Sequence, residues 1–71
     1  MQIVAYEVDL RGYSGEEFEI RRGLLEAHTW TMDEYANIPG LFSVTFDLDF
    51  TNVPLPTLLK VPANRITQVG E

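Results

Sequence analysis

The chain contains no cysteine, a single histidine, His28, and a single lysine among its 71 residues. Without cysteine it cannot form disulfide bonds, thiolate nucleophiles or sulfur-based zinc sites, a composition typical of a reducing compartment. A hydrolytic triad has little support, because His28 stands alone and only Ser14 and Ser43 provide serine hydroxyls. We therefore expect a protein that is not an enzyme and that carries no cofactor, with His28 as a packing residue.

Positive charge is also scarce. Eleven acidic residues and five basic ones give a formal net charge of −6. Nucleic-acid binding depends on clustered Lys and Arg, and the only adjacent basic pair is Arg21-Arg22. We expect no direct binding to nucleic acid, and we expect a protein partner with a basic surface.

Long apolar runs are missing as well. No stretch approaches the roughly 18 apolar residues of a membrane span, and Met1-Gln2-Ile3 has no signal-like character. We expect no membrane contact and a cytoplasmic location. A length of 71 residues with a hydrophobic fraction of 45% predicts a single small globular domain, residues 1–71, and an entire small gene product.

The clearest pattern that is present runs from Phe42 to Phe50, where apolar and polar residues alternate. Its apolar positions are Phe42, Val44, Phe46, Leu48 and Phe50. Its polar positions are Ser43, Thr45, Asp47 and Asp49. Because successive strand side chains point to opposite faces, this pattern predicts a β-strand with one dry face and one wet, acidic face.

The first third of the chain also reads as strands. Ile3 to Leu10 alternates, with Val4, Tyr6, Val8 and Leu10 on one face and Ala5, Glu7 and Asp9 on the other. Residues 11–15 contain two glycines and predict a loop. Phe18 and Ile20 predict a second strand that bends at Gly23, whereas residues 24–30 are compatible with either a strand or a helix.

The remaining segments complete a barrel. Thr31 and Glu34 match a capping box, which predicts a short helix through Ile38 that Pro39-Gly40 ends. Residues 53–56 hold two prolines and predict a loop. Two short strands are then expected at Leu58–Val61 and Ile66–Val69. The predicted fold is mainly β: a small antiparallel five-stranded barrel with one short helix.

Three segments resemble the Src-homology-3 family. Val4-Ala5-Tyr6-Glu7-Val8 is similar to the A-L-Y-D-Y opening of that family, and residues 16–26 are similar to its E-L-S-F-x-K/R-G-D-x-I segment. Pro62-Ala63-Asn64-Arg65-Ile66 is similar to the closing P-S/A-N-Y-V, including a 3₁₀ turn. These segments cover about half of the chain, and residues 27–57 depart from the family pattern.

The resemblance implies a Src-homology-3-like barrel and, with it, a shelf for proline-rich peptides. Tyr6, Pro62 and Asn64 keep the places of shelf residues. Val8 and Arg65 stand where the family has tyrosines, and the groove tryptophan has no clear counterpart unless Trp30 replaces it in space. The resemblance therefore implies the fold more than it implies recognition of proline-rich peptides.

Two groups of residues are candidates for partner contacts. Asp47 and Asp49 share one face of the predicted strand, where carboxylates could bind Mg²⁺ or Ca²⁺, remain solvated or meet a basic partner; we expect no metal, since a site needs more ligands. Tyr13, Glu16 and Glu17 surround the first loop, where an exposed tyrosine would be favoured at an interface. Trp30 is a second candidate aromatic anchor.

These features predict a protein-binding module that acts as an accessory subunit, adaptor or inhibitor through an acidic face. An alternative is an acidic mimic of nucleic acid, such as a small phage-type inhibitor of a DNA- or RNA-binding protein. A second alternative is a barrel that binds a metal or small ligand. A third is a ubiquitin-like β-grasp domain, in which Glu26–Ile38 would form one longer helix across the sheet.

Overall fold

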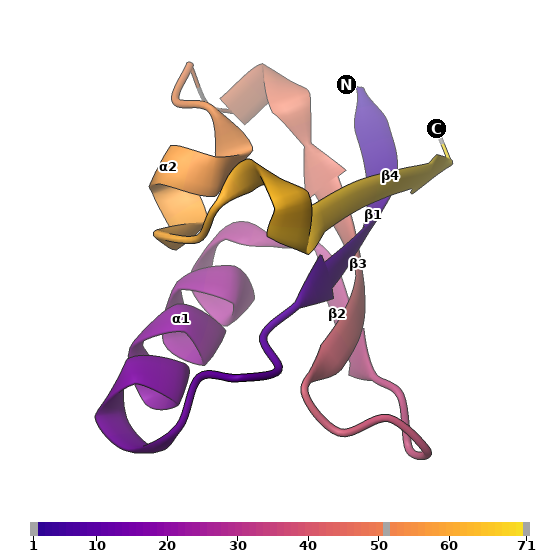
Figure 1. The fold of residues 1–71 in the computed structure, drawn as a ribbon. Coiled ribbons are helices and arrows are strands. Elements are labelled where there is room, and N and C mark those ends of the chain that lie inside the picture. Colours follow the sequence, from indigo (N-terminus) through magenta and orange to yellow (C-terminus); the bar gives the residue numbers. More distant parts are fainter. Residues whose placement is uncertain (1, 51, 71) are drawn as a thin grey trace.

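The computed structural model describes residues 2–50 and 52–70, which form one antiparallel sheet with two helices on the same side of it (Figure 1). The strands are β1 (Ile3–Asp9), β2 (Thr31–Glu34), β3 (Leu41–Asp47) and β4 (Ile66–Gly70). The helices are α1 (Gly15–His28) and α2 (Leu55–Leu59), and 3₁₀ turns span Leu48–Phe50 and Ala63–Arg65.

The sheet has the strand order β2-β3-β1-β4, and every neighbouring pair is antiparallel. The prediction of a small, mainly β fold built on antiparallel strands is thereby confirmed. The predicted closed barrel of five strands is wrong, because β2 and β4 lie at opposite edges of a four-stranded sheet and do not pair. The family resemblance itself stays a prediction.

The two central strands follow the predicted alternation. Val4 pairs with Phe46 and Val8 pairs with Phe42 across β1 and β3, so the apolar sets of both strands share one face. The strand ends earlier than predicted, because the chain turns into a 3₁₀ helix at Leu48, whose amide donates to the Gln2 carbonyl at 2.9 Å. The predicted dry-face position of the Phe50 side chain lies outside the described part of the structure.

The second predicted strand is instead helix α1. Phe18 and Leu25 are seven residues apart, two helical turns, and both pack into the core, whereas Ile20 is largely exposed. Glu17 pairs with Arg21 at 2.8 Å in the i,i+4 geometry that stabilises helices. The Phe18/Ile20 alternation was too short to distinguish a strand from this longer helical period.

The predicted capping-box helix is instead strand β2. The Thr31 hydroxyl lies 2.8 Å from that of Thr45 on β3, and the Glu34 carboxylate accepts a hydrogen bond from the Gly40 amide at 2.7 Å. Both side chains that would cap a helix therefore bond across the β2–β3 hairpin. Gly40 has a φ of 93°, a conformation that favours glycine at this turn.

The C-terminal third holds one correct prediction and one error. Ile66–Gly70 is the predicted last strand, preceded by the predicted 3₁₀ turn. The predicted strand Leu58–Val61 is wrong, because Leu58 and Leu59 belong to α2, in which Pro56 occupies the first turn, where a missing amide is tolerated.

The core lies between the sheet and the helices. Val8, Phe42 and Val44 from the strands, with Leu10 directly after β1, meet Leu25 of α1, Leu59 of α2 and the following Val61. All of them are almost completely buried. The helices therefore cover one face of the sheet and leave the other face uncovered (Figure 1). No helix in residues 2–50 and 52–70 is long and apolar enough to cross a membrane.

Candidate functional site

The predicted acidic pair Asp47 and Asp49 is not a wet strand face. Asp47 is the last residue of β3 and is only 5% exposed. Its carboxylate accepts hydrogen bonds from the Gln2 amide at 3.3 Å and the Asp49 amide at 3.0 Å. Asp47 thus fixes the turn where β3 ends, and the expectation that it forms a solvated acidic face is wrong. Asp49 follows in the 3₁₀ turn and is exposed.

Tyr13 lies in the predicted loop but is half-buried there. Its ring stacks against two guanidinium groups, Arg21 at 4.3 Å and Arg65 at 5.1 Å from the ring centroid. Arg65 also donates to the Arg11 carbonyl, and Arg21 donates to the Lys60 carbonyl at 3.1 Å. Tyr13 therefore joins the loop, α1 and the segment before β4. Its contact with a partner stays a prediction.

Glu16 and Glu17 occupy the first turn of α1 and are exposed. Acidic side chains at this position oppose the positive end of the helix dipole, and Glu17 is already paired with Arg21. Both residues consequently have a role in the helix, and a role in binding stays a prediction for them.

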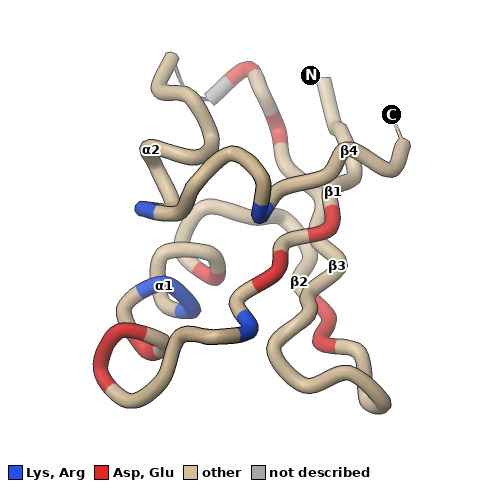
Figure 2. The backbone as a smooth tube through the Cα atoms, viewed as in Figure 1, with Lys and Arg blue, Asp and Glu red and all other residues tan. Residues whose placement is uncertain are grey.

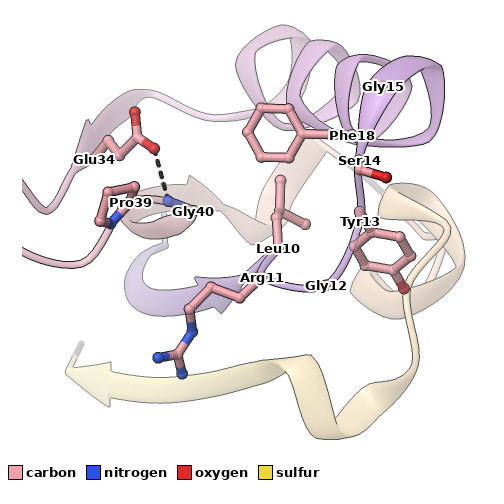
Figure 3. Close-up of a pocket in the computed structure, with 10 residues that line it drawn as sticks. All are labelled: Leu10, Arg11, Gly12, Tyr13, Ser14, Gly15, Phe18, Glu34, Pro39 and Gly40. Carbon is pink, nitrogen blue, oxygen red and sulfur yellow. Dashed lines mark hydrogen bonds between the residues drawn. The ribbon is translucent and has the colours of Figure 1, made fainter.

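An open groove of about 410 Å³ lies beside this loop at one end of the sheet (Figure 3). Leu10 and Phe18 lie between the loop and the Pro39–Gly40 turn, and the Arg11 side chain extends away from them. The Glu34 carboxylate at the rim is bonded to the Gly40 amide. The ten lining residues include neither His nor Lys, so the groove can receive an apolar group but presents no histidine base.

The uncovered side of the sheet carries polar residues on all four strands, and the alternation places the apolar Ile3, Ala5 and Leu41 on the same side. We call this surface the polar face; its polar members are Glu7, Asp9, Thr31, Asp33, Ser43, Thr45 and Thr67. One row crosses the whole sheet, because Asp33 pairs with Ser43, Ser43 with Glu7, and Glu7 with Thr67. Two carboxylates thus flank a small serine. Because neighbouring strands are evenly spaced, the Cα atoms of Asp33 and Glu7 are about 10 Å apart.

The strands carry charge of one sign only. None of the four described strands contains Lys or Arg; their charged residues are Glu7, Asp9, Asp33, Glu34 and Asp47. The basic residues lie on the helices and on the loops that join the elements (Figure 2). Glu34 and Asp47 bond to backbone amides, as described above, and Asp9 pairs with Arg11 at 3.0 Å. Glu7 and Asp33 remain, and neither enters an ion pair within residues 2–50 and 52–70.

At one end of the polar face, the pKa of Asp9 is shifted from its ordinary value. Hydrogen bonds from the Arg11 side chain lower the pKa of Asp9 below its ordinary value, although partial burial opposes the change. Asp9 likewise raises the pKa of Arg11. Next to this pair, the Tyr35 hydroxyl donates to the Glu7 carboxylate at 3.1 Å, so Glu7 is oriented from the side of β2.

The edge of β2 bears the exposed aromatic residues. Trp30, directly before the strand, is 57% exposed, and Tyr35, directly after it, is 38% exposed. The predicted anchor Trp30 is therefore available at the surface. Its amide donates to the Thr45 carbonyl at 2.9 Å, which holds its backbone against β3.

His28, which we expected to be a packing residue, is instead exposed at the last residue of α1, on a different element from the strands of the polar face. Within the described ranges, no group of three or more His, Asp or Glu residues is arranged to hold a metal ion.

Comparison of the chain with protein-family models, with curated proteins and with solved structures finds no match.

Of the two carboxylates in the row, the sequence placed Glu7 correctly and did not place Asp33. The alternation in Ile3–Leu10 correctly placed Glu7 opposite the dry face. It missed Asp33, because Thr31 and Glu34 imitate a helix cap and so moved Asp33 onto a helix. The available signal for a strand was Thr31 itself, since β-branched residues favour strands. In the structure it pairs with another threonine, Thr45.

Proposed function

We propose that this protein is a non-enzymatic binding module whose polar face recognises a basic surface of another protein. The observation that carries the proposal is the row Asp33–Ser43–Glu7. It sets two carboxylates without ion-pair partners in the described structure on either side of a short side chain, on a sheet without basic residues.

The geometry of the row supports a partner that presents Lys or Arg. Ser43 between the two carboxylates is short, and the Tyr35 side chain reaches across β3 to Glu7. The Tyr35 hydroxyl holds the Glu7 carboxylate in place, so less conformational freedom is lost when a cation binds. Charge complementarity of this kind steers association and fixes register more than it adds affinity.

In this proposal the protein works as an accessory subunit, adaptor or inhibitor. If the basic surface of the partner is itself a DNA- or RNA-binding site, occupation by the polar face would exclude the nucleic acid. The predicted nucleic-acid mimic is then a special case of the same recognition, and competition between the protein and a DNA duplex for that partner distinguishes it.

A charge-neutralising pair of variants tests the proposal. We expect Glu7→Gln combined with Asp33→Asn to weaken binding of a fluorescent Lys/Arg-rich peptide about fivefold to tenfold, because two exposed ionic contacts contribute about 1 kcal/mol or somewhat more. Anisotropy titrations at about 20 mM and about 200 mM salt should show binding that weakens with salt.

The matched control is Glu16→Gln combined with Glu19→Gln on the exposed side of α1, which changes the net charge equally. We expect it to alter the affinity by less than about twofold. Equal losses in the two double variants would show that the peptide senses only overall charge, and the proposal would then be wrong. The control also tests Glu16 as a partner contact.

A further inference from the structure

We infer that the basic partner binds as an extended segment that adds to the free edge of β2 as a fifth strand. This inference rests on the proposed function, and it specifies the form in which the partner is held. It follows from three observations at β2: its free backbone groups, the exposed Trp30 directly before it, and its charge.

The backbone of β2 has hydrogen-bonding groups that face away from the sheet. The Tyr35 amide donates to the Leu41 carbonyl of the neighbouring strand at 3.0 Å. Because inward and outward residues alternate along an antiparallel pair, Thr31 and Asp33 also bond to β3, whereas the amides and carbonyls of Met32 and Glu34 point to the open edge. Such an edge can pair with an added strand.

The opposite edge is less suited to this pairing. The amide of Ile66, the first residue of β4, already donates to the Ala63 carbonyl. Near the other end of β4 the register with β1 shifts between Ala5 and Tyr6, which interrupts the strand. The regular run of outward-facing backbone groups on β4 is therefore interrupted.

An aromatic anchor lies at one end of the β2 edge. Trp30, directly before the strand, is 57% exposed, whereas the Tyr35 side chain reaches across β3 to Glu7 and so points away from the edge. Trp is among the residues most enriched where binding energy is concentrated at interfaces. A strand laid along Met32 and Glu34 would pass beside Trp30.

The negative charge of β2 determines which kind of strand can be added to its edge. A second copy of this chain, paired antiparallel through its own β2, would bring Asp33 and Glu34 of each copy close to the carboxylates of the other, and like charges across a strand pair destabilise it. A basic segment is attracted instead. Its residues on the side of the polar face would be Lys or Arg beside Asp33, and those on the covered side would be apolar beside the half-buried Met32.

Alternating peptides provide the test. The probe is an acetylated Lys-Val-Arg-Val-Lys-Val-Arg amide, with two derivatives N-methylated either at every Val or at every basic residue. Both derivatives keep the charge of the probe, and each loses one of the two rows of backbone donors. We expect one derivative to bind at least tenfold more weakly and the other to keep the affinity of the probe within about twofold, because only one row faces β2.

Two further measurements locate the peptide. We expect bound probe to slow hydrogen exchange of the Met32 and Glu34 amides at least tenfold, with the Gln68 amide of β4 unchanged. We also expect Trp30→Ala to weaken binding about threefold to tenfold, whereas Val69→Ala, which removes an equally exposed side chain from β4, should have little effect.

The outcomes separate the inference from the proposed function. Equal binding of both methylated derivatives, with unchanged exchange at Met32 and Glu34, would overturn strand addition even if the Glu7/Asp33 double variant still bound weakly. If the unmethylated probe does not bind, or binds the double variant equally well, the proposed function fails and the inference fails with it.

Discussion

The two faces of the sheet differ although they are built from the same strands. On β3, Phe42 and Val44 are each 1% exposed and pack beneath the helices, whereas Ser43 and Thr45 between them belong to the polar face. The covered face carries large apolar side chains from β1, β3 and both helices. The polar face carries small hydroxyls and two carboxylates without ion pairs in the described structure. One face therefore stabilises the fold, and the other is the face to which we assign recognition in the proposed function.

Substitutions at two neighbouring residues of β3 are expected to differ most in their effect on the free energy of unfolding. We expect Phe42→Ala to lower the free energy of unfolding by about 3–5 kcal/mol, since it leaves a cavity under the helices. We expect Ser43→Ala to change it by less than about 0.5 kcal/mol. Urea denaturation of both variants measures the difference. Similar costs for the two variants would contradict the assignment of stability to one face.

Asp47 alternates with the covered positions of β3 and is nevertheless buried. We expect Asp47→Ala to cost about 1–3 kcal/mol, because the amides of Gln2 and Asp49 lose their acceptor. Asp33→Ala, which removes an exposed carboxylate of the polar face, should stay within about 0.5 kcal/mol. Thermal or urea unfolding compares the two; a costly Asp33→Ala would mean that the polar face is itself structural.

The smallest expected effect depends on pH and lies at Asp9. Its folded-state pKa is lowered, chiefly by the Arg11 hydrogen bond. The pair therefore stabilises the fold at pH values above the ordinary carboxyl pKa of about 3.9, and that contribution disappears as the pH falls through the lower folded-state value. Because both side chains are partly exposed, solvent screens the interaction and the gain at neutral pH is expected to be small.

A double-mutant cycle of Asp9→Asn and Arg11→Gln isolates this contribution. We expect a small coupling free energy at pH 7 that disappears once Asp9 is protonated in the folded state. A coupling that persists unchanged under strongly acidic conditions would show that the pair is held by something other than its charge.

The sequence predicted the elements whose period is long and regular. Ile3–Leu10 and the strand that begins near Phe42 alternate over many residues, so β1 and β3 were found with their correct faces. Both errors in the middle arose from short local signals: Phe18 and Ile20 imitate a strand, and Thr31 with Glu34 imitates a helix cap. Tertiary pairing decided both cases, because β2 bonds to β3 and α1 packs through Leu25.

The candidate site was harder to predict than the fold. Glu7 could be placed on the polar side from its own strand, but the row Asp33–Ser43–Glu7 exists only after β2 and β1 are both paired with β3. Asp47 failed as a candidate for a related reason. Its position in the alternation predicted exposure, whereas the end of the strand turns the chain and buries the carboxylate against backbone amides.

The most direct test of the contrast between the faces is a residue-by-residue NMR titration with the alternating basic peptide. We expect the amide signals of Asp33, Ser43 and Glu7 to shift together and saturate, whereas those of Leu25 and Leu59 in the helices should not move. Shifts centred on α1 or on the groove around Leu10 and Phe18, with the polar face unchanged, would contradict it.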